Sequence, residues 1–148
     1  MNETLDDRTT AYILETRRPF EDLRQVASQL AGLLVLAASG ARSAGPGHPL
    51  LHAARETLDR AGDEIRSARP SPRSRRHHEY LLGAVGALDQ AVSAASLRLR
   101  GDRLADVDAV LGPLKAGYGQ LQAAAGRLPG FELVAFNQGC CASSKCEV

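Results

Sequence analysis

Large aromatic and β-branched side chains are scarce in this chain. It has no tryptophan, three tyrosines and three phenylalanines, and its 8 valines and 2 isoleucines stand against 24 alanines and 21 leucines. Alanine and leucine lose little side-chain freedom in a helix, whereas valine and isoleucine favour strands. The composition therefore predicts an all-α protein and argues against a β-sheet.

An excess of charge of one sign is also lacking. The 18 basic and 17 acidic residues leave a formal net charge of +1. This excludes the basic balance of a dedicated nucleic-acid-binding protein and argues against a nucleic-acid partner. The length of 148 residues and the 44% of hydrophobic residues predict one globular domain. Because 16 of the basic residues are arginine, and alanine is in excess, we expect a bacterial source with a GC-rich genome.

Long hydrophobic runs are absent. The most apolar stretch, Leu30–Ala38, has nine residues, whereas a membrane span needs about 20. The first residues, Met1–Asp7, are acidic and carry no signal-peptide pattern. We therefore expect a cytoplasmic protein without a membrane partner. In that reducing compartment, cysteines serve as thiols or metal ligands more often than as structural disulfides.

Four segments share one apolar rhythm, with alternating steps of three and four residues. They are Pro19–Ser39, Pro49–Ala68, Pro72–Leu99 and Asp102–Leu128. The stripe of the third segment, for example, consists of His78, Leu81, Val85, Leu88, Val92, Ala95 and Leu99. Such steps place all these side chains on one face of a helix, whereas a strand requires steps of two. The sequence therefore predicts four amphipathic helices.

Turn-forming residues lie where these helices are expected to begin or bend. Three prolines fall in predicted first turns, where a missing N–H costs no helical hydrogen bond: Pro19, Pro49 and Pro72. Asp102 is the expected N-cap of the fourth helix. Gly112 and Pro113 interrupt that helix, which should kink or split there. Because the apolar stripe continues in phase across them, we expect a kink.

Short connections make successive helices antiparallel, so residues 19–128 are expected to form an up-down-up-down four-helix bundle. Residues 1–18 are either a short helix or an extension of the first one. Residues 129–148 form a cysteine-containing tail, and we expect Phe131 and Phe136 to anchor it on the bundle. The many alanines in the core leave room for a second copy, so a homodimer is the expected assembly.

All three cysteines, Cys140, Cys141 and Cys146, fall within seven residues of that tail. Neighbouring cysteines form a mutual disulfide only with strain. Thiolates gathered on a short loop suit a soft metal ion such as zinc or copper, and they equally suit a redox pair with a third, resolving thiol. The spacing differs from the C-x2-C pair of zinc ribbons, and chance clustering in a frayed terminus is the plain alternative.

Histidines are expected at both ends of the bundle. His77 and His78 begin the third helix, at the end where the tail departs, whereas His48 and His52 begin the second helix at the opposite end. A helix of 20 residues is about 30 Å long, so histidines at opposite ends of the bundle cannot share a ligand. This argues against a haem held by two histidines inside the bundle. His78 lies on the apolar stripe, where a partly buried histidine with a hydrogen-bonding partner is the plain expectation. The alternative is a mixed sulfur and nitrogen site with the tail.

One cluster of arginines surrounds the second predicted loop. Its members are Arg66, Arg69, Arg73, Arg75 and Arg76. A solvated loop is the plain interpretation. A functional one is an anion site at the start of the third helix, formed by Arg73, Arg75 and Arg76. The same charges would lower the pKa of nearby thiols.

Other site chemistries find no support. No histidine follows an acid by three residues, as di-iron bundles require, and neither a phosphate-binding loop nor a nucleophile elbow is present.

Three hypotheses for the function remain. The first is a binding protein whose tail, with His77 or His78, presents a soft-metal or thiol-redox site. The second is a non-catalytic accessory subunit that docks to a larger partner. The third, ranked last, is an enzyme with a cysteine nucleophile and a histidine base.

Overall fold

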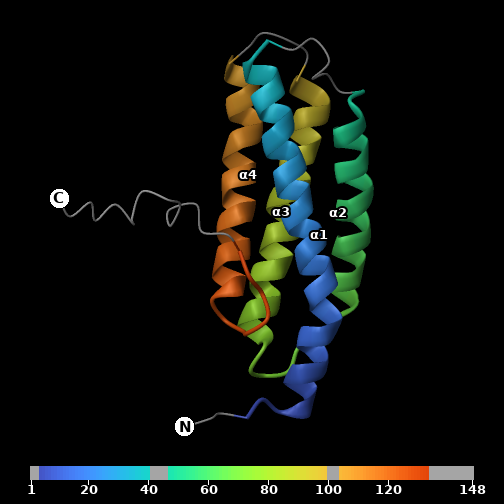
Figure 1. Cartoon of the computed structure of the whole chain (residues 1–148), viewed down its shortest axis with the longest axis vertical. Helices are drawn as coiled ribbons and strands as arrows, with labels where there is room; N and C mark the ends of the chain where they lie inside the picture. Colours follow the sequence, from blue (N-terminus) through green and yellow to red (C-terminus); the bar gives the residue numbers. More distant parts are fainter. Residues whose placement is uncertain (1–3, 41–46, 100–103, 134–148) are drawn as a thin grey trace, which may run out of the picture.

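The described part of the chain is entirely helical. The structure, a computed structural model, describes residues 4–40, 47–99 and 104–133. Those residues contain four helices and no strand (Figure 1). The helices are α1 (Asp7–Ala38), α2 (Pro49–Ser67), α3 (Arg75–Arg98) and α4 (Leu104–Ala125). The prediction of an all-α protein with four helices is confirmed.

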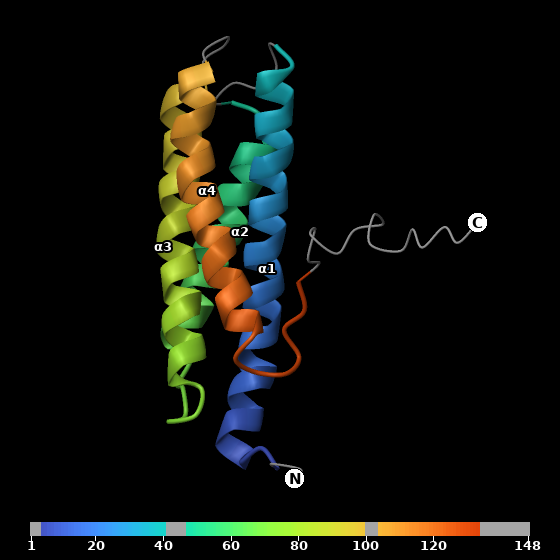
Figure 2. The same cartoon turned by 90° about the vertical axis from the view of Figure 1, so that its left-hand side faces the viewer.

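The four helices lie side by side along the long axis of the molecule (Figures 1 and 2). The most extensive contacts join α3 with α4 and α1 with α2, while α1 also touches α3 and α4. The start of α3 and the end of α4 lie at the same end of the molecule as the first turns of α1 (Figure 1). Three segments far apart in the sequence therefore meet there, and we call this region the histidine end.

Helix α1 begins earlier than predicted, at Asp7 instead of Pro19. The side chain of Asp6 caps it by accepting a hydrogen bond from the backbone N–H of Thr9, at 2.9 Å. Pro19 is buried inside the helix, so its prediction as a first-turn residue is wrong. A proline removes only one helical hydrogen bond, and burial of Tyr12 and Thr16 continues the apolar face across it. The alternative expectation, that residues before Pro19 extend the first helix, is confirmed from Asp7 onward.

The prediction for the start of the second helix is confirmed, and that for the third is wrong. Pro49 lies in the first turn of α2. Helix α3 begins at Arg75, after a turn that contains Pro72. Ser71 and Ser74 stabilise this turn, because the backbone N–H of each donates to the hydroxyl of the other, at 2.7 and 3.2 Å. These local bonds replace the first helical turn that the proline alone would suggest.

Helix α4 runs without interruption across Pro113. The expectation that the helix continues past this proline is therefore confirmed, and the alternative, a split, is wrong. The helix ends at Ala125 and not at the predicted Leu128. Two backbone bonds close its last turn, from the N–H of Gly126 and of Arg127. The predicted N-cap, Asp102, lies outside the described residues.

The predicted apolar stripes form the core. In the third segment every stripe residue from Leu81 to Leu99 is buried. Helices α3 and α4 approach closely at Gly117, where an added Cβ atom would lie 3.0 Å from Cδ2 of Leu88. A glycine at this position thus allows the close approach of these two helices.

Candidate functional site

A buried cluster of polar and aromatic side chains lies at the histidine end. It joins Tyr12 from α1 to His77 and His78 from α3. The hydroxyl oxygen of Tyr12 lies 2.9 Å from Nδ1 of His77 and 3.5 Å from Nδ1 of His78. Tyr12 is 1% exposed and His77 is fully buried. One hydroxyl thus connects two neighbouring imidazoles in surroundings with little water.

His78 is partly buried and its Nδ1 lies 3.5 Å from the hydroxyl of Tyr12, as expected of a histidine on the apolar stripe. His77, which was not assigned to that stripe, is the fully buried residue. Both lie at helical spacing from Leu81, at four and three residues. The sequence pattern alone did not separate them. The structure distinguishes the two histidines, because the hydroxyl of Tyr12 lies closer to the ring of His77 than to that of His78.

Burial favours the neutral form of both imidazoles. Desolvation is the main cause that lowers the pKa of His77 to about 4, and the neighbouring His78 lowers it further. Desolvation also lowers the pKa of His78, although the carboxylates of Glu15 and Glu79 act in the opposite direction. For Tyr12, burial raises the phenol pKa above its usual value. The cluster is therefore uncharged, which suits its apolar surroundings.

A second chain of hydroxyl groups ties the start of α1 to the turn before α3. The hydroxyl of Thr9 lies 2.7 Å from that of Ser71 and donates to the carboxylate of Asp6, also at 2.7 Å. Those two hydroxyl-bearing residues and Ser74 are buried. The two hydrogen bonds from Thr9 hold the pKa of Asp6 below its usual value. These bonds fix α1 against the loop that positions the histidines.

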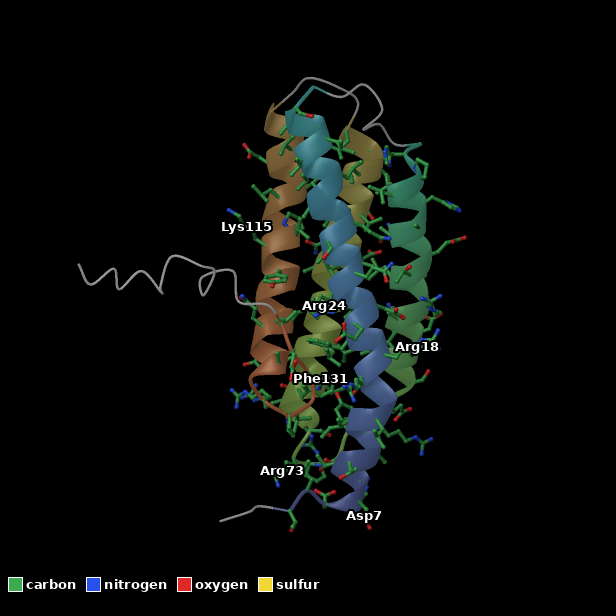
Figure 3. The ribbon with its side chains drawn as sticks, viewed as in Figure 1. Asp7, Arg18, Arg24, Arg73, Lys115 and Phe131 are labelled. Carbon is green, nitrogen blue, oxygen red and sulfur yellow. The ribbon has the colours of Figure 1, made fainter. Side chains whose placement is uncertain are left out.

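Phe131 covers the histidine cluster. This residue follows α4, is 4% exposed, and lies at the histidine end (Figure 3). Its ring centroid is 4.2 Å from that of His77 and 5.1 Å from that of Phe20, which it meets edge-on. The expectation that Phe131 is buried is confirmed. Phe136, the other expected anchor, lies outside the described residues.

The remaining predicted site residues form no shared centre within the described residues. Cys140, Cys141 and Cys146 lie outside them. In the part of the chain that is described, no three His, Cys, Asp or Glu residues are grouped as a metal site. The histidines of the second helix lie at the opposite end, as expected (Figure 1). There Nδ1 of His48 accepts from the N–H of Leu50, and His52 pairs with Glu56 at 3.4 Å.

The arginine cluster lies at the histidine end and is exposed. Arg66 pairs with Asp63 at 3.0 Å, and Arg76 pairs with Glu79 at 3.2 Å. The labelled Arg73 lies beyond the start of α3 (Figure 3). Arg73 and Arg75, the other two candidates for anion binding, are both exposed. The ion pairs of Arg66 and Arg76 agree with the plain interpretation of a solvated loop.

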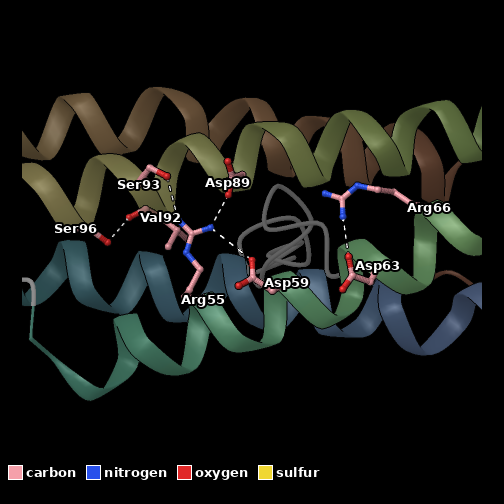
Figure 4. A network of polar contacts seen from close by, with 8 residues as sticks. All are labelled: Arg55, Asp59, Asp63, Arg66, Asp89, Val92, Ser93 and Ser96. Carbon is pink, nitrogen blue, oxygen red and sulfur yellow. Dashed lines mark hydrogen bonds and ion pairs between the residues drawn. The ribbon is translucent and has the colours of Figure 1, made fainter.

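A network of charged residues between α2 and α3 was not predicted from the sequence (Figure 4). The guanidinium of Arg55 contacts the carboxylate of Asp89 and donates to the hydroxyl of Ser93 at 3.0 Å. It also lies 3.7 Å from Asp59 on its own helix. The spacing between Arg55 and Asp59 is visible in the sequence, but the contacts with α3 depend on how the two helices are aligned. The network links α2 to α3.

Comparison of the chain with models of protein families, with curated proteins and with solved structures gives no match. One helix of the described residues, Arg75–Leu97, is long and apolar enough to cross a membrane by length and composition alone. Its most apolar window of 18 residues has a mean hydropathy of 1.2, and the helix packs against α2 and α4. Core helices of water-soluble proteins have the same length and composition.

Proposed function

We propose that the protein is a small cytoplasmic binding protein, an up-down-up-down four-helix bundle whose C-terminal tail presents thiolates to a soft metal ion. The ligands are Cys140, Cys141 and Cys146, and the ion is zinc or copper. The observation that carries the proposal is the burial of Phe131 on His77. It fixes the start of the tail at the histidine end.

The reach of the chain supports this placement. Cys140 follows Phe131 by nine residues, which span at most about 30 Å when extended. If these nine residues are not fully extended, they can bring the thiolates back to the histidine end, close to the anchor Phe131. Three thiolates and one imidazole complete the four-coordinate shell that zinc prefers.

Of the two candidate imidazoles, His78 suits this role better than His77. The ring of His77 is fully buried between Tyr12 and Phe131. The ring of His78 is partly exposed, and burial lowers its pKa, which favours the neutral form that binds metal ions. Tyr12 contacts its Nδ1, which leaves Nε2 as the ligand atom.

A metal titration with matched variants tests the proposal. The reduced full-length chain competes with a chromophoric chelator for Zn²⁺ and for Cu⁺. We expect the triple change of the three cysteines to serine to abolish binding. His78→Gln is expected to weaken it about 10- to 100-fold, and the control His52→Gln, at the opposite end, to leave it unchanged. Binding that survives loss of all three cysteines contradicts the proposal. Thiols that bind no metal yet react rapidly with a disulfide reagent favour the redox alternative.

A second candidate function, an accessory subunit that docks to a larger protein, is favoured by exposed apolar side chains. Leu14, Val35 and Leu97 are each more than two-thirds exposed. They are distributed over α1 and α3, so they suit an extended contact along the helices. Light scattering of the purified chain over a range of concentrations tests the homodimer variant of this proposal. If the chain is an accessory subunit of a larger protein, we expect the purified chain alone to be a monomer whose thiols bind no metal.

A further inference from the structure

The segment that carries Phe131 is held to the helices mainly by side chains. After the last turn of α4, no backbone–backbone hydrogen bond joins residues 128–133 to the other described residues. A bond of 3.4 Å from Arg24 to the carbonyl of Glu132 lies exposed. Gly130 adopts a φ of +90°, which favours glycine, and turns the chain towards α1. We call residues 128–133 the arm.

The arm inserts one aromatic ring between two helices. Phe131 lies against Phe20 of α1 on one side and against His77 of α3 on another. Its neighbour Glu132 is exposed, while Leu128 is buried at the base of the arm. The aromatic rings that Phe131 contacts therefore belong to α1 and α3 and not to the arm.

The phenylalanine ring is an incomplete match for this site. Nε2 of His77 is buried and has no hydrogen-bonding partner among the described residues. Nδ1 of the same ring is already in contact with the hydroxyl of Tyr12. A hydrocarbon ring cannot bond to Nε2, so the arm leaves a buried polar atom unsatisfied. Most buried polar atoms have partners, and those without one call for an explanation.

We infer that this site binds a small aromatic molecule with a hydroxyl group on its ring, and that Phe131 occupies the site in the absence of that ligand. A phenolic ring can meet Phe20 edge-on and lie tilted against His77 as Phe131 does, and its hydroxyl can serve as a partner for Nε2. The arm swings away on binding, because few backbone bonds hold it. The inference shares Phe131 with the proposed function, because a ligand that displaces the arm also releases the start of the tail, but it does not require the cysteines to bind a metal ion.

The test compares two probes that differ by one hydroxyl group, p-cresol and toluene. Phe131→Ala empties the site of its ring, so we expect this variant to bind p-cresol at least about tenfold more tightly than the wild-type chain does. Adding His77→Leu removes Nε2, and the ratio of p-cresol to toluene affinity should then fall about tenfold. The control Leu97→Ala, which removes an exposed apolar side chain at the other end of α3, should change neither affinity.

Three results overturn the inference. A folded Phe131→Ala chain that binds neither probe contradicts it, as does equal affinity in the variant and the wild-type chain. So does an affinity ratio that His77→Leu leaves unchanged. If circular dichroism shows that a variant does not fold, hydrogen exchange on the wild-type chain tests the displacement of the arm instead. Saturating p-cresol should accelerate exchange of the amides of residues 130–133, and unaltered exchange contradicts the proposed displacement of the arm.

Discussion

Single side chains at the histidine end have roles that follow from burial. His77 is enclosed by Tyr12 on one side and Phe131 on another, and its imidazole is uncharged. A buried polar ring of this kind depends on each hydrogen bond it makes, because water cannot replace a lost partner. Tyr12 is therefore the residue whose loss the site should tolerate least.

Tyr12→Phe should destabilise the protein by about 1–3 kcal/mol. The change keeps the ring but removes the hydroxyl that contacts Nδ1 of His77, which leaves a buried nitrogen without a partner. Urea unfolding followed by circular dichroism measures the free energy of unfolding. The control Tyr80→Phe alters a half-exposed ring that faces Arg127, and it should change stability by less than about 0.5 kcal/mol. Equal effects of both changes would show that the hydroxyl of Tyr12 has no special role.

Stability should fall as the pH is lowered from 6.5 to 4. The unfolded chain binds a proton at His77 below about pH 6.5, but the folded chain does so only near its lowered pKa of about 4. Between these values the unfolded state binds more protons, so acid favours it. The contribution is fully present above pH 6.5 and amounts to about 3 kcal/mol at most. Urea unfolding between pH 4 and 7 measures it, and His77→Leu should flatten the profile while His52→Gln does not.

At the scale of helices, close packing and interhelical ion pairs determine how the elements fit together. Helices α3 and α4 meet at Gly117, and α2 is tied to α3 through Arg55 and Asp89. The two kinds of contact differ in cost, because a steric overlap in a packed interface is expensive whereas an exposed ion pair contributes little. Substitutions at the two interfaces should therefore differ in size.

Gly117→Ala and Gly119→Ala should change stability in opposite directions. At Gly117 the new methyl group meets the side chain of Leu88 at 3.0 Å, so we expect a loss of about 1–3 kcal/mol. At Gly119 nothing lies within 4 Å. There the better helix propensity of alanine should stabilise the protein by about 0.5–1 kcal/mol. Thermal unfolding distinguishes the two, and a stabilised Gly117→Ala would contradict the close approach of α3 and α4.

A double-mutant cycle on Arg55 should separate the two kinds of ion pair. We expect a coupling energy of about 0.5–1 kcal/mol between Arg55 and Asp89, which lie on different helices. The pair of Arg55 and Asp59 on one helix should give less, about 0.3–0.5 kcal/mol. The cycles use Arg55→Met with Asp89→Asn or Asp59→Asn, and chemical unfolding measures each corner. A larger coupling within α2 than between the helices would contradict the arrangement in Figure 4.

For the whole molecule, the buried faces of the helices could be predicted, because they depend on the apolar periodicity of the sequence. The helix starts and the contacts between helices could not, because they depend on local hydrogen bonds and on how the helices are aligned. The stripe from Leu81 to Leu99 is buried because burial of an apolar face stabilises a helix whatever its neighbours are. The start of α1 was missed because Pro19 was interpreted as a first-turn residue, although the N-cap signal of Asp6 was present. Phe131 was found because a large aromatic residue rarely remains in solvent.

The contacts between different helices at the site could not be predicted from the apolar pattern of single segments. Tyr12 continues the stripe of α1 towards its N-terminus, so its burial was open to prediction, but its contact with His77 was not. That contact, like the one between Arg55 and Asp89, requires knowledge of how two helices are aligned along their axes. Periodicity within one segment contains no such information. The bond between Thr9 and Ser71, 62 residues apart, belongs to the same class.

The proposal that the tail thiolates bind a soft metal ion has one direct test. The untagged full-length protein is reduced, incubated with Zn²⁺ or Cu⁺, freed of excess metal by gel filtration, and analysed for metal content per chain. The account predicts about one equivalent of zinc or copper, as a site with three thiolates and one imidazole requires. Folded protein with three free thiols and less than about a tenth of an equivalent would contradict a closed four-ligand site.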